Sequence, residues 1–289
     1  MLMHAFHRLA FPLCLVVAVP AIGCGGGVAS EQVASTQPAT AVTAPVAPSA
    51  HGMVKVVAEA LAVVPLSAAQ RTQIESLAAN AEARHAESLA ARKDLMLALA
   101  TQVETGRIDR ATIAPKINDL AAANAKAQPA DRAAFEQLHA LLTPDQRAAF
   151  VSALEARFAE RKGEMRAKHP LQQWAADLQL SDAQKAEIKA ALHERFQGMA
   201  HEHSWGGAGP MGAGHRGAKV LAAFKADRFV MDEVAPVKDA SQFVPQRAER
   251  LLALAEAAVP VLTPGQRSIA AQKIRAKADA SGEIGSHWE

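Results

Sequence analysis

Apolar side chains recur every three or four residues along most of the chain, which is the spacing of one face of an α-helix. Three such stripes can be traced, and short apolar segments run from Val57 to Val64 and from Leu171 to Leu178. The pattern predicts a chain built from amphipathic helices. The stripe positions are Ile74, Leu77, Ala81, His85, Leu89, Met96 and Leu99; Phe150, Leu154 and Phe158; and Ile188, Leu192, Phe196 and Met199.

A short motif, Leu-[Ser/Thr]-x-x-Gln-[Arg/Lys], occurs four times. Ser or Thr at a helix N-cap accepts a hydrogen bond from a free backbone N–H, and Gln three residues later reaches back to the N-cap N–H. Each motif therefore predicts a helix start, and we interpret its residues as structural. The motif residues are Leu66, Ser67 and Gln70; Leu142, Thr143 and Gln146; Leu180, Ser181 and Gln184; and Leu262, Thr263 and Gln266.

The four motifs form two pairs of similar spacing, and a short apolar helix is expected before each pair. A repeated spacing of this kind indicates a repeated structural unit. We therefore predict a tandem duplication, with one helical repeat at 53–168 and a second at 169–281, followed by a tail at 282–289. The second repeat carries a Gly/His-rich insertion, for which we predict a loop at 198–217.

Composition agrees with helix and excludes some classes of function. Half of the residues are hydrophobic, but only 4% are aromatic, and the net charge is +2. Ala- and Leu-rich chains with few aromatic residues favour helix over sheet. The balanced charge gives no electrostatic reason to expect nucleic acid as a partner.

The N-terminal segment predicts export. Residues 1–23 combine a weakly basic start with an apolar stretch that is short and interrupted by proline, as in a cleaved signal peptide. Ala21-Ile22-Gly23-Cys24 resembles a bacterial lipobox, which implies lipid attachment at Cys24; the alternative is an ordinary signal peptide cut near Ala29. Residues 24–52 read as a flexible tether. Because Gly25 rather than Asp follows Cys24, we expect an outer-membrane anchor facing the periplasm.

The paired motifs behind an export signal resemble the Spy/CpxP family of periplasmic proteins. That resemblance implies four-helix hairpin units, here two in tandem, that form a thin, curved helical bundle as a monomer or dimer. It also implies an ATP-independent chaperone or stress-response protein whose partners are unfolded or misfolded envelope proteins. Exposed apolar strips would hold such clients, with basic residues on their rim. The candidate rim residues are Arg71, Arg147, Lys185 and Arg267.

Two alternatives remain open: a metal-binding or metal-resistance protein of the envelope, and a structural lipoprotein. The metal hypothesis rests on histidines and methionines in and beside the insertion, because imidazole suits Zn²⁺ or Cu²⁺ and thioether suits Cu⁺. The same segment also reads as a solvated loop without a metal, or as one that binds metal weakly. The candidate ligands are His193, His201, His203 and His215.

The sequence contains no recognisable catalytic constellation. Its two cysteines, Cys14 and Cys24, lie in the export segment, and we find no nucleophile elbow, HExxH motif or phosphate-binding loop. We therefore expect a protein that is not an enzyme and requires no cofactor. We interpret His85, which lies on an apolar stripe, as a hydrogen-bonded core residue, and place His139 and His169 near helix ends.

Overall fold

The computed structural model describes residues 46–168, 170–202, 210–236 and 243–280, without the side chains of 165–171, 196–216 and 243. Within these ranges the regular elements are helices and there is no strand, which confirms the predicted all-α class. None of the described helices is long and apolar enough to cross a membrane. The helices are α1 (Gly52–Leu61), α2 (Ala68–Thr105), α3 (Arg110–Leu141), α4 (Pro144–Lys168), α5 (Pro170–Asp177), α6 (Asp182–Glu202), α7 (Pro210–Phe224), α8 (Met231–Val234), α9 (Phe243–Ala258) and α10 (Pro264–Ala280).

All four motifs begin a helix, and each forms the two hydrogen bonds of a capping box. At the start of α2, Gln70 N donates to Ser67 Oγ over 3.2 Å, and Ser67 N donates to Gln70 Oε1 over 2.9 Å. The same pair of bonds starts α4, α6 and α10. Pro144 and Pro264 occupy the first position of their helices, where a missing N–H costs nothing.

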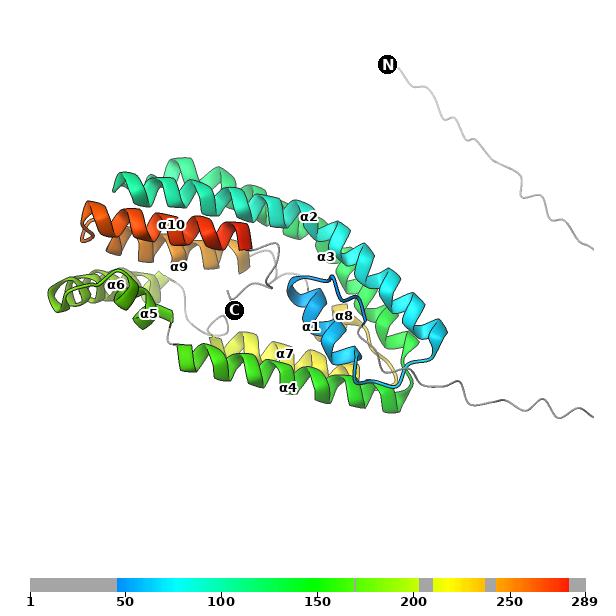
Figure 1. Ribbon diagram of the computed structural model, residues 1–289. Helices are drawn as coiled ribbons and strands as arrows, with labels where there is room; N and C mark the ends of the chain where they lie inside the picture. The colour runs from blue at the N-terminus through cyan, green and yellow to red at the C-terminus, as the bar shows by residue number, and fades with distance from the viewer. Residues whose placement is uncertain (1–45, 169, 203–209, 237–242, 281–289) are drawn as a thin grey trace, which may run out of the picture. The chain divides into compact units, whose positions relative to one another are not determined.

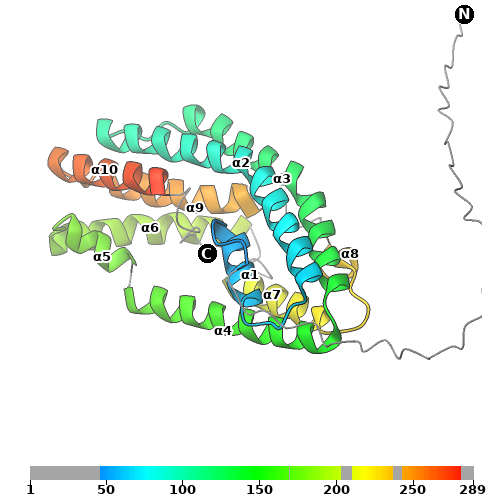
Figure 2. The ribbon, with the colours of Figure 1, turned by 45° about the vertical axis from the view of Figure 1, so that its right-hand side comes forward.

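The longest elements, α2 and α3, form a hairpin and lie side by side (Figures 1 and 2). Gly106 ends α2 in the left-handed conformation at φ +82°, and its N–H donates to Gln102 O over 3.1 Å. Asp109 then starts α3 by accepting from Ala111 N over 3.0 Å. These two residues turn the chain within four positions and so place the two helices against each other.

Buried apolar side chains form two clusters. The first, which we call the aromatic core, contains the buried Phe150, Phe224 and Phe229. The second, the aliphatic core, is built from Leu, Ile, Val, Ala and Met. The other buried residues of the aromatic core are Val46, Val56, Ala60, Leu61, Val64, Leu66, Ile74, Leu138, Leu142, Val151, Leu154 and Leu221. The aliphatic core comprises Leu95, Met96, Leu99, Ala100, Val103, Ile113, Leu178, Leu252, Ala255, Val259, Leu262, Ala270, Ala271, Ile274 and Ala278.

Each core takes side chains from both predicted repeats. In the aromatic core, Phe150 of α4 packs with Phe224 of α7 at a ring-centroid distance of 5.3 Å. In the aliphatic core, Leu99 of α2 and Ile113 of α3 cluster with Ile274 of α10. Neither 53–168 nor 169–281 therefore contains a complete core by itself. The duplication itself remains a prediction.

Two segments predicted to be irregular are more ordered than expected. The C-terminal end of the tether, predicted over 24–52, packs onto the helices: Val46 and Ala50 are 3% and 5% exposed, and α1 begins at Gly52. The loop predicted over 198–217 is wrong at both ends, because α6 continues to Glu202 and α7 begins at Pro210. Val46 and Ala50 are ordered because apolar side chains gain by burial. Pro210 can begin α7 within a Gly-rich stretch because proline favours the first helical position. The predicted signal peptide, Cys24, His169 and the tail at 282–289 lie outside the described residues.

Candidate functional site

The motif glutamines join pairs of helix starts. Gln70 Nε2 donates to Leu141 O over 2.7 Å and to Gln146 Oε1 over 2.8 Å. In return, Gln146 Nε2 donates to Pro65 O over 2.6 Å and to Gln70 Oε1 over 3.1 Å. The two amides therefore hold each other and tie the start of α2 to the start of α4.

The second motif pair makes the same arrangement. Gln184 Nε2 donates to Val261 O over 2.9 Å and to Gln266 Oε1 over 2.8 Å. Gln266 Nε2 donates to Leu178 O over 3.0 Å and to Gln184 Oε1 over 3.2 Å. Since both amide groups of each pair are bonded within the protein, these glutamines act as structural joints rather than as a ligand site.

In each motif pair, an arginine follows the second glutamine and reaches a turn of the other predicted repeat. Arg147 is 7% exposed and donates to Leu142 O over 3.2 Å and to Asp227, just after α7, over 2.8 Å. Arg267 donates to Leu262 O over 3.0 Å and lies against Gly106, just after α2. Arg147 is thus buried in a structural contact, which corrects its expected place on an exposed rim.

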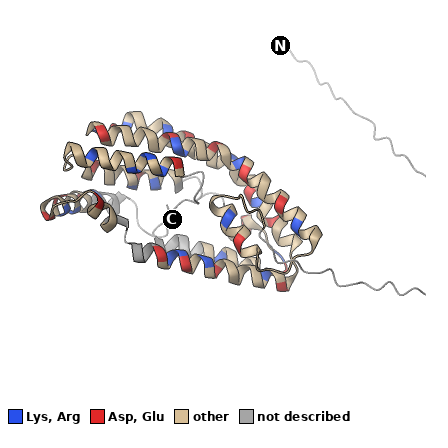
Figure 3. Cartoon of the chain, in the orientation of Figure 1, with Lys and Arg blue, Asp and Glu red and all other residues tan. Residues whose placement is uncertain are grey.

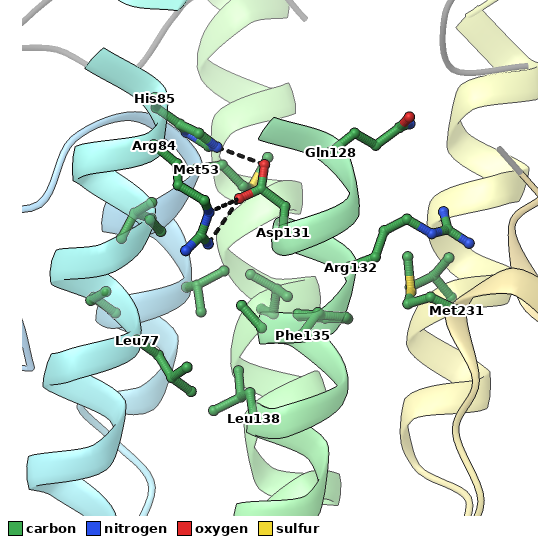
Figure 4. A pocket seen from close by; sticks show the side chains of 18 of the residues that line it. Met53, Leu77, Arg84, His85, Gln128, Asp131, Arg132, Phe135, Leu138 and Met231 are labelled. Atoms are coloured by element: carbon green, nitrogen blue, oxygen red, sulfur yellow. Dashed lines mark hydrogen bonds and ion pairs between the residues drawn. The ribbon is translucent and has the colours of Figure 1, made fainter. Parts of the chain in front are cut away.

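A cavity of about 730 Å³ lies beside the aromatic core (Figure 4). Its wall comes from α1, α2, α3, α4, α7, α8 and α9, and most lining side chains are apolar. The large apolar side chains that are exposed among the described residues are Met53, which lines the cavity, Val63 and Ile269. Among the described side chains, the apolar surface open to a ligand is therefore concentrated in the cavity rather than in exposed strips.

A three-residue ionic group stands in the wall of this cavity. His85 Nε2 donates to Asp131 Oδ2 over 2.8 Å, and Arg84 donates from Nε and Nη2 to Asp131 Oδ1 over 3.1 and 3.0 Å (Figure 4). All three side chains are between 23% and 34% exposed. The group links α2 to α3, and it agrees with the interpretation of His85 as a hydrogen-bonded residue.

The ionic group shifts the pKa values of two of its members. The hydrogen bond to Asp131 raises the pKa of His85 above 6.5, with the Asp131 charge adding to it and partial burial opposing it. Burial acts to raise the pKa of Asp131, but the hydrogen bonds and charges of His85 and Arg84 outweigh it and leave that pKa lowered. The arrangement therefore favours a protonated imidazole beside an ionised carboxylate.

Two other histidines are fixed by hydrogen bonds. His51, which precedes α1, donates from its backbone N to Glu82 Oε1 over 2.8 Å and from Nδ1 to Glu82 Oε2 over 3.0 Å. His139, in the last turn of α3, is buried and donates from Nε2 to Ala226 O over 2.8 Å. Its ring stacks on Phe229 at 5.2 Å. His51 thus ties the start of α1 to α2, and His139 ties α3 to the turn after α7.

The proposed metal ligands are only partly visible. His193 is an exposed residue of α6, whereas His201 in α6 and His215 in α7 have side chains that are not described, and His203 lies outside the described residues. Among the side chains that are described, no group of three His, Cys, Asp or Glu has the geometry to hold a metal ion. The metal hypothesis therefore stays a prediction.

Charged residues of both signs are interspersed along the described helices (Figure 3). The wall of the cavity contains Arg84, Arg132 and Arg247 and the carboxylate Asp131; Arg84 pairs with Asp131, and Arg132 pairs with Asp232. Sequence reasoning missed Asp131, which lies 46 residues from His85. The one local signal was a titratable side chain, His85, in the middle of an apolar stripe.

Comparison with known proteins gives one match. A family model described as LTXXQ motif family protein matches residues 53–154, which include the first motif pair. No curated protein and no solved structure matches the chain.

Proposed function

The chain belongs to the LTXXQ motif family through residues 53–154, and from that premise we propose that it is an ATP-independent, chaperone-like protein of the cell envelope. This family is of the Spy/CpxP type and is associated with the periplasm and the envelope. The proposed partners are unfolded or misfolded envelope proteins.

The observation that carries this proposal is the apolar cavity with arginines in its wall. An unfolded protein exposes apolar side chains that gain about 25 cal/mol for each Å² removed from water. The cavity offers such side chains a place to insert, while Arg84 and His85, two cationic side chains that share the one carboxylate of Asp131, favour segments that also carry acidic residues. Binding of this kind is reversible and needs no nucleotide.

We further propose that Cys24 carries a lipid and that the chain is held at the outer membrane, facing the periplasm. An anchor of this type raises the local concentration of the protein near newly exported clients. The proposed activity is binding rather than chemical turnover, so the protein is not expected to be an enzyme.

Aggregation of a reduced or heated client, followed by light scattering, tests the proposed function. The chain beginning at Gly25, without lipid, should suppress scattering at a few-fold molar excess. Ala81→Phe, which fills the cavity from the middle of α2, should weaken suppression, whereas the matched change Ala86→Phe on the exposed side of α2 should not. No suppression at several-fold excess would reject the chaperone and leave the metal-binding protein and the structural lipoprotein as the alternatives.

A further inference from the structure

The cavity has a polar end and an apolar end. Figure 4 shows Arg84 and His85 of α2 facing Asp131 of α3, with Leu77 and Leu138 further along the same two helices. Seven residues separate Leu77 from Arg84, and seven separate Asp131 from Leu138. Each interval is two helical turns, or about 10 Å. The wall therefore changes from ionic to apolar along the axis of the α2–α3 hairpin.

The polar end favours an anion. Arg84 uses Nε and Nη2 to hold Asp131, and its second terminal nitrogen, Nη1, makes no hydrogen bond to a described residue. Arg132 also lines the cavity and pairs with the exposed Asp232 at 2.5 Å. The ionic group itself sets two cationic side chains, Arg84 and the protonated His85, against the single carboxylate of Asp131, so an incoming negative charge meets positive potential.

The apolar end restricts the chemistry of what enters. Leu77, Phe135 and Leu138 line it, and none of them carries a hydrogen-bonding side-chain group. A peptide backbone placed there would bury N–H and C=O groups without partners, which is costly. An unfolded client therefore reaches this end with its side chains alone. A hydrocarbon chain has no polar group to satisfy and can enter along its whole length.

We propose that this cavity binds a single-chain amphiphile with an anionic headgroup, the headgroup at Arg84 and the acyl chain against Leu77, Phe135 and Leu138. A volume of about 730 Å³ lies within the range of small-molecule sites. The headgroup chemistry, a carboxylate or a phosphate, is that of a free fatty acid or a lysophospholipid. The site is the cavity that we propose for clients, but the amphiphile does not depend on chaperone activity.

Isothermal titration below the critical micelle concentration tests the proposal with three 12-carbon probes: dodecanoate, a lysophosphatidylglycerol and uncharged dodecanol. We expect one site per chain for the two anions, and about 10-fold weaker binding of dodecanol, as the loss of one charge-assisted contact predicts. Binding of either anion alone supports the proposal and identifies the headgroup. No binding of either anion, or equal binding of dodecanol, overturns it.

Two variants and one control test whether the amphiphile binds in this cavity. Arg84→Gln should weaken the anions about 10-fold and leave dodecanol unchanged, since it removes the charge but not the apolar wall. Ala81→Phe should weaken all three probes without touching the ion pair, and Ala86→Phe should weaken none. If Ala81→Phe binds like the unmodified protein, the amphiphile site lies elsewhere and the proposal is wrong. If an apolar peptide or a second copy of the chain occupies the cavity and dodecanoate does not displace it, the cavity belongs to that occupant and the proposal is wrong.

Aggregation assays with the same variants separate this proposal from the proposed function. A protein that binds dodecanoate but does not suppress aggregation has the amphiphile site without the chaperone activity. A protein that suppresses aggregation but does not bind either anion has the chaperone activity, and the amphiphile proposal is then wrong.

Discussion

Gln70 and Gln146 each donate a hydrogen bond to the side-chain oxygen of the other, at 2.8 and 3.1 Å, across 76 residues of sequence. Each glutamine also caps its own helix with the same oxygen. The motif therefore does two things at once: it starts a helix, and it fixes that helix to the start of another.

Replacing Gln70 with Glu should destabilise the fold by about 2–4 kcal/mol, because a carboxylate cannot donate to Leu141 O or to Gln146 Oε1 and places negative charge against both. Urea unfolding measures the difference. Gln73→Glu, an exposed change on the same helix, should lie within about 0.5 kcal/mol of the unmodified protein. Equal losses of stability for the two changes would contradict the role of Gln70 in joining the starts of α2 and α4.

Gly106→Ala should cost about 1–2 kcal/mol, since φ at this position is +82° and a side chain there is strained. The added Cβ would also lie 2.9 Å from Cζ of Arg267, which must move away. Gly163→Ala is the matched control: it lies inside α4 with open space around it, and it should stabilise the helix by up to about 1 kcal/mol. Thermal unfolding of both variants checks the opposite signs.

The His85–Asp131 pair should make part of the stability depend on pH. Because the folded-state pKa of His85 is raised, its contribution is fully present below about 6.5, the pKa of the unfolded chain, and is lost as pH rises through the folded value. The lowered pKa of Asp131 acts only under more acidic conditions, where its contribution is lost as pH falls. His85→Gln should therefore cost more stability at pH 5.5 than at pH 8.5. Equal losses in urea unfolding at the two pH values would contradict this assignment.

Residues 46–168 alone should not form a stable monomer. That piece contains Phe150 and Leu138 but lacks Leu221, Phe224 and Phe229, which complete the aromatic core. We expect a broad thermal transition by circular dichroism, and a sharper transition when residues 169–280 are added. A cooperative, monomeric transition of the first piece at the melting temperature of the whole chain would show that it folds independently.

The metal hypothesis predicts binding of Zn²⁺ or Cu²⁺ that depends on His201 and His203. Calorimetric titration of the unmodified chain against a variant with both changed to Ala measures it. Affinity weaker than about 100 μM, or affinity unchanged by the substitutions, would reject a dedicated site.

The helices and their starts could be predicted because they depend on neighbours close in sequence. The stripe from Ile74 to Leu99 repeats at helical spacing, and Ser67 meets Gln70 within one turn. The cavity could not be predicted in this way. Its ionic group joins Arg84 to Asp131 across 47 residues, and only the packing of α2 against α3 brings them together.

The sequence also could not predict that each core takes side chains from both repeats. Both repeats carry the same motif and similar stripes, so the pattern is compatible with each half packing on itself or on the other. The structure shows that the halves pack on each other at this point, because Arg147 of the first half bonds to Asp227 of the second half. Val46 shows a related limit: it lies in a stretch of Ala, Thr, Val and Pro without periodicity, yet it is buried in the aromatic core.

The two cores differ at positions equally far from their motif glutamines. Four residues after Gln146 stands Phe150, and four residues after Gln266 stands Ala270; both are buried. In a symmetric homodimer a single gene change alters both copies of such a position together. Here each position is encoded separately, so one core can become aromatic and border a cavity while the buried side chains of the other stay aliphatic. A chain of this design can specialise one of its two sides for a ligand and keep the other for mechanical support.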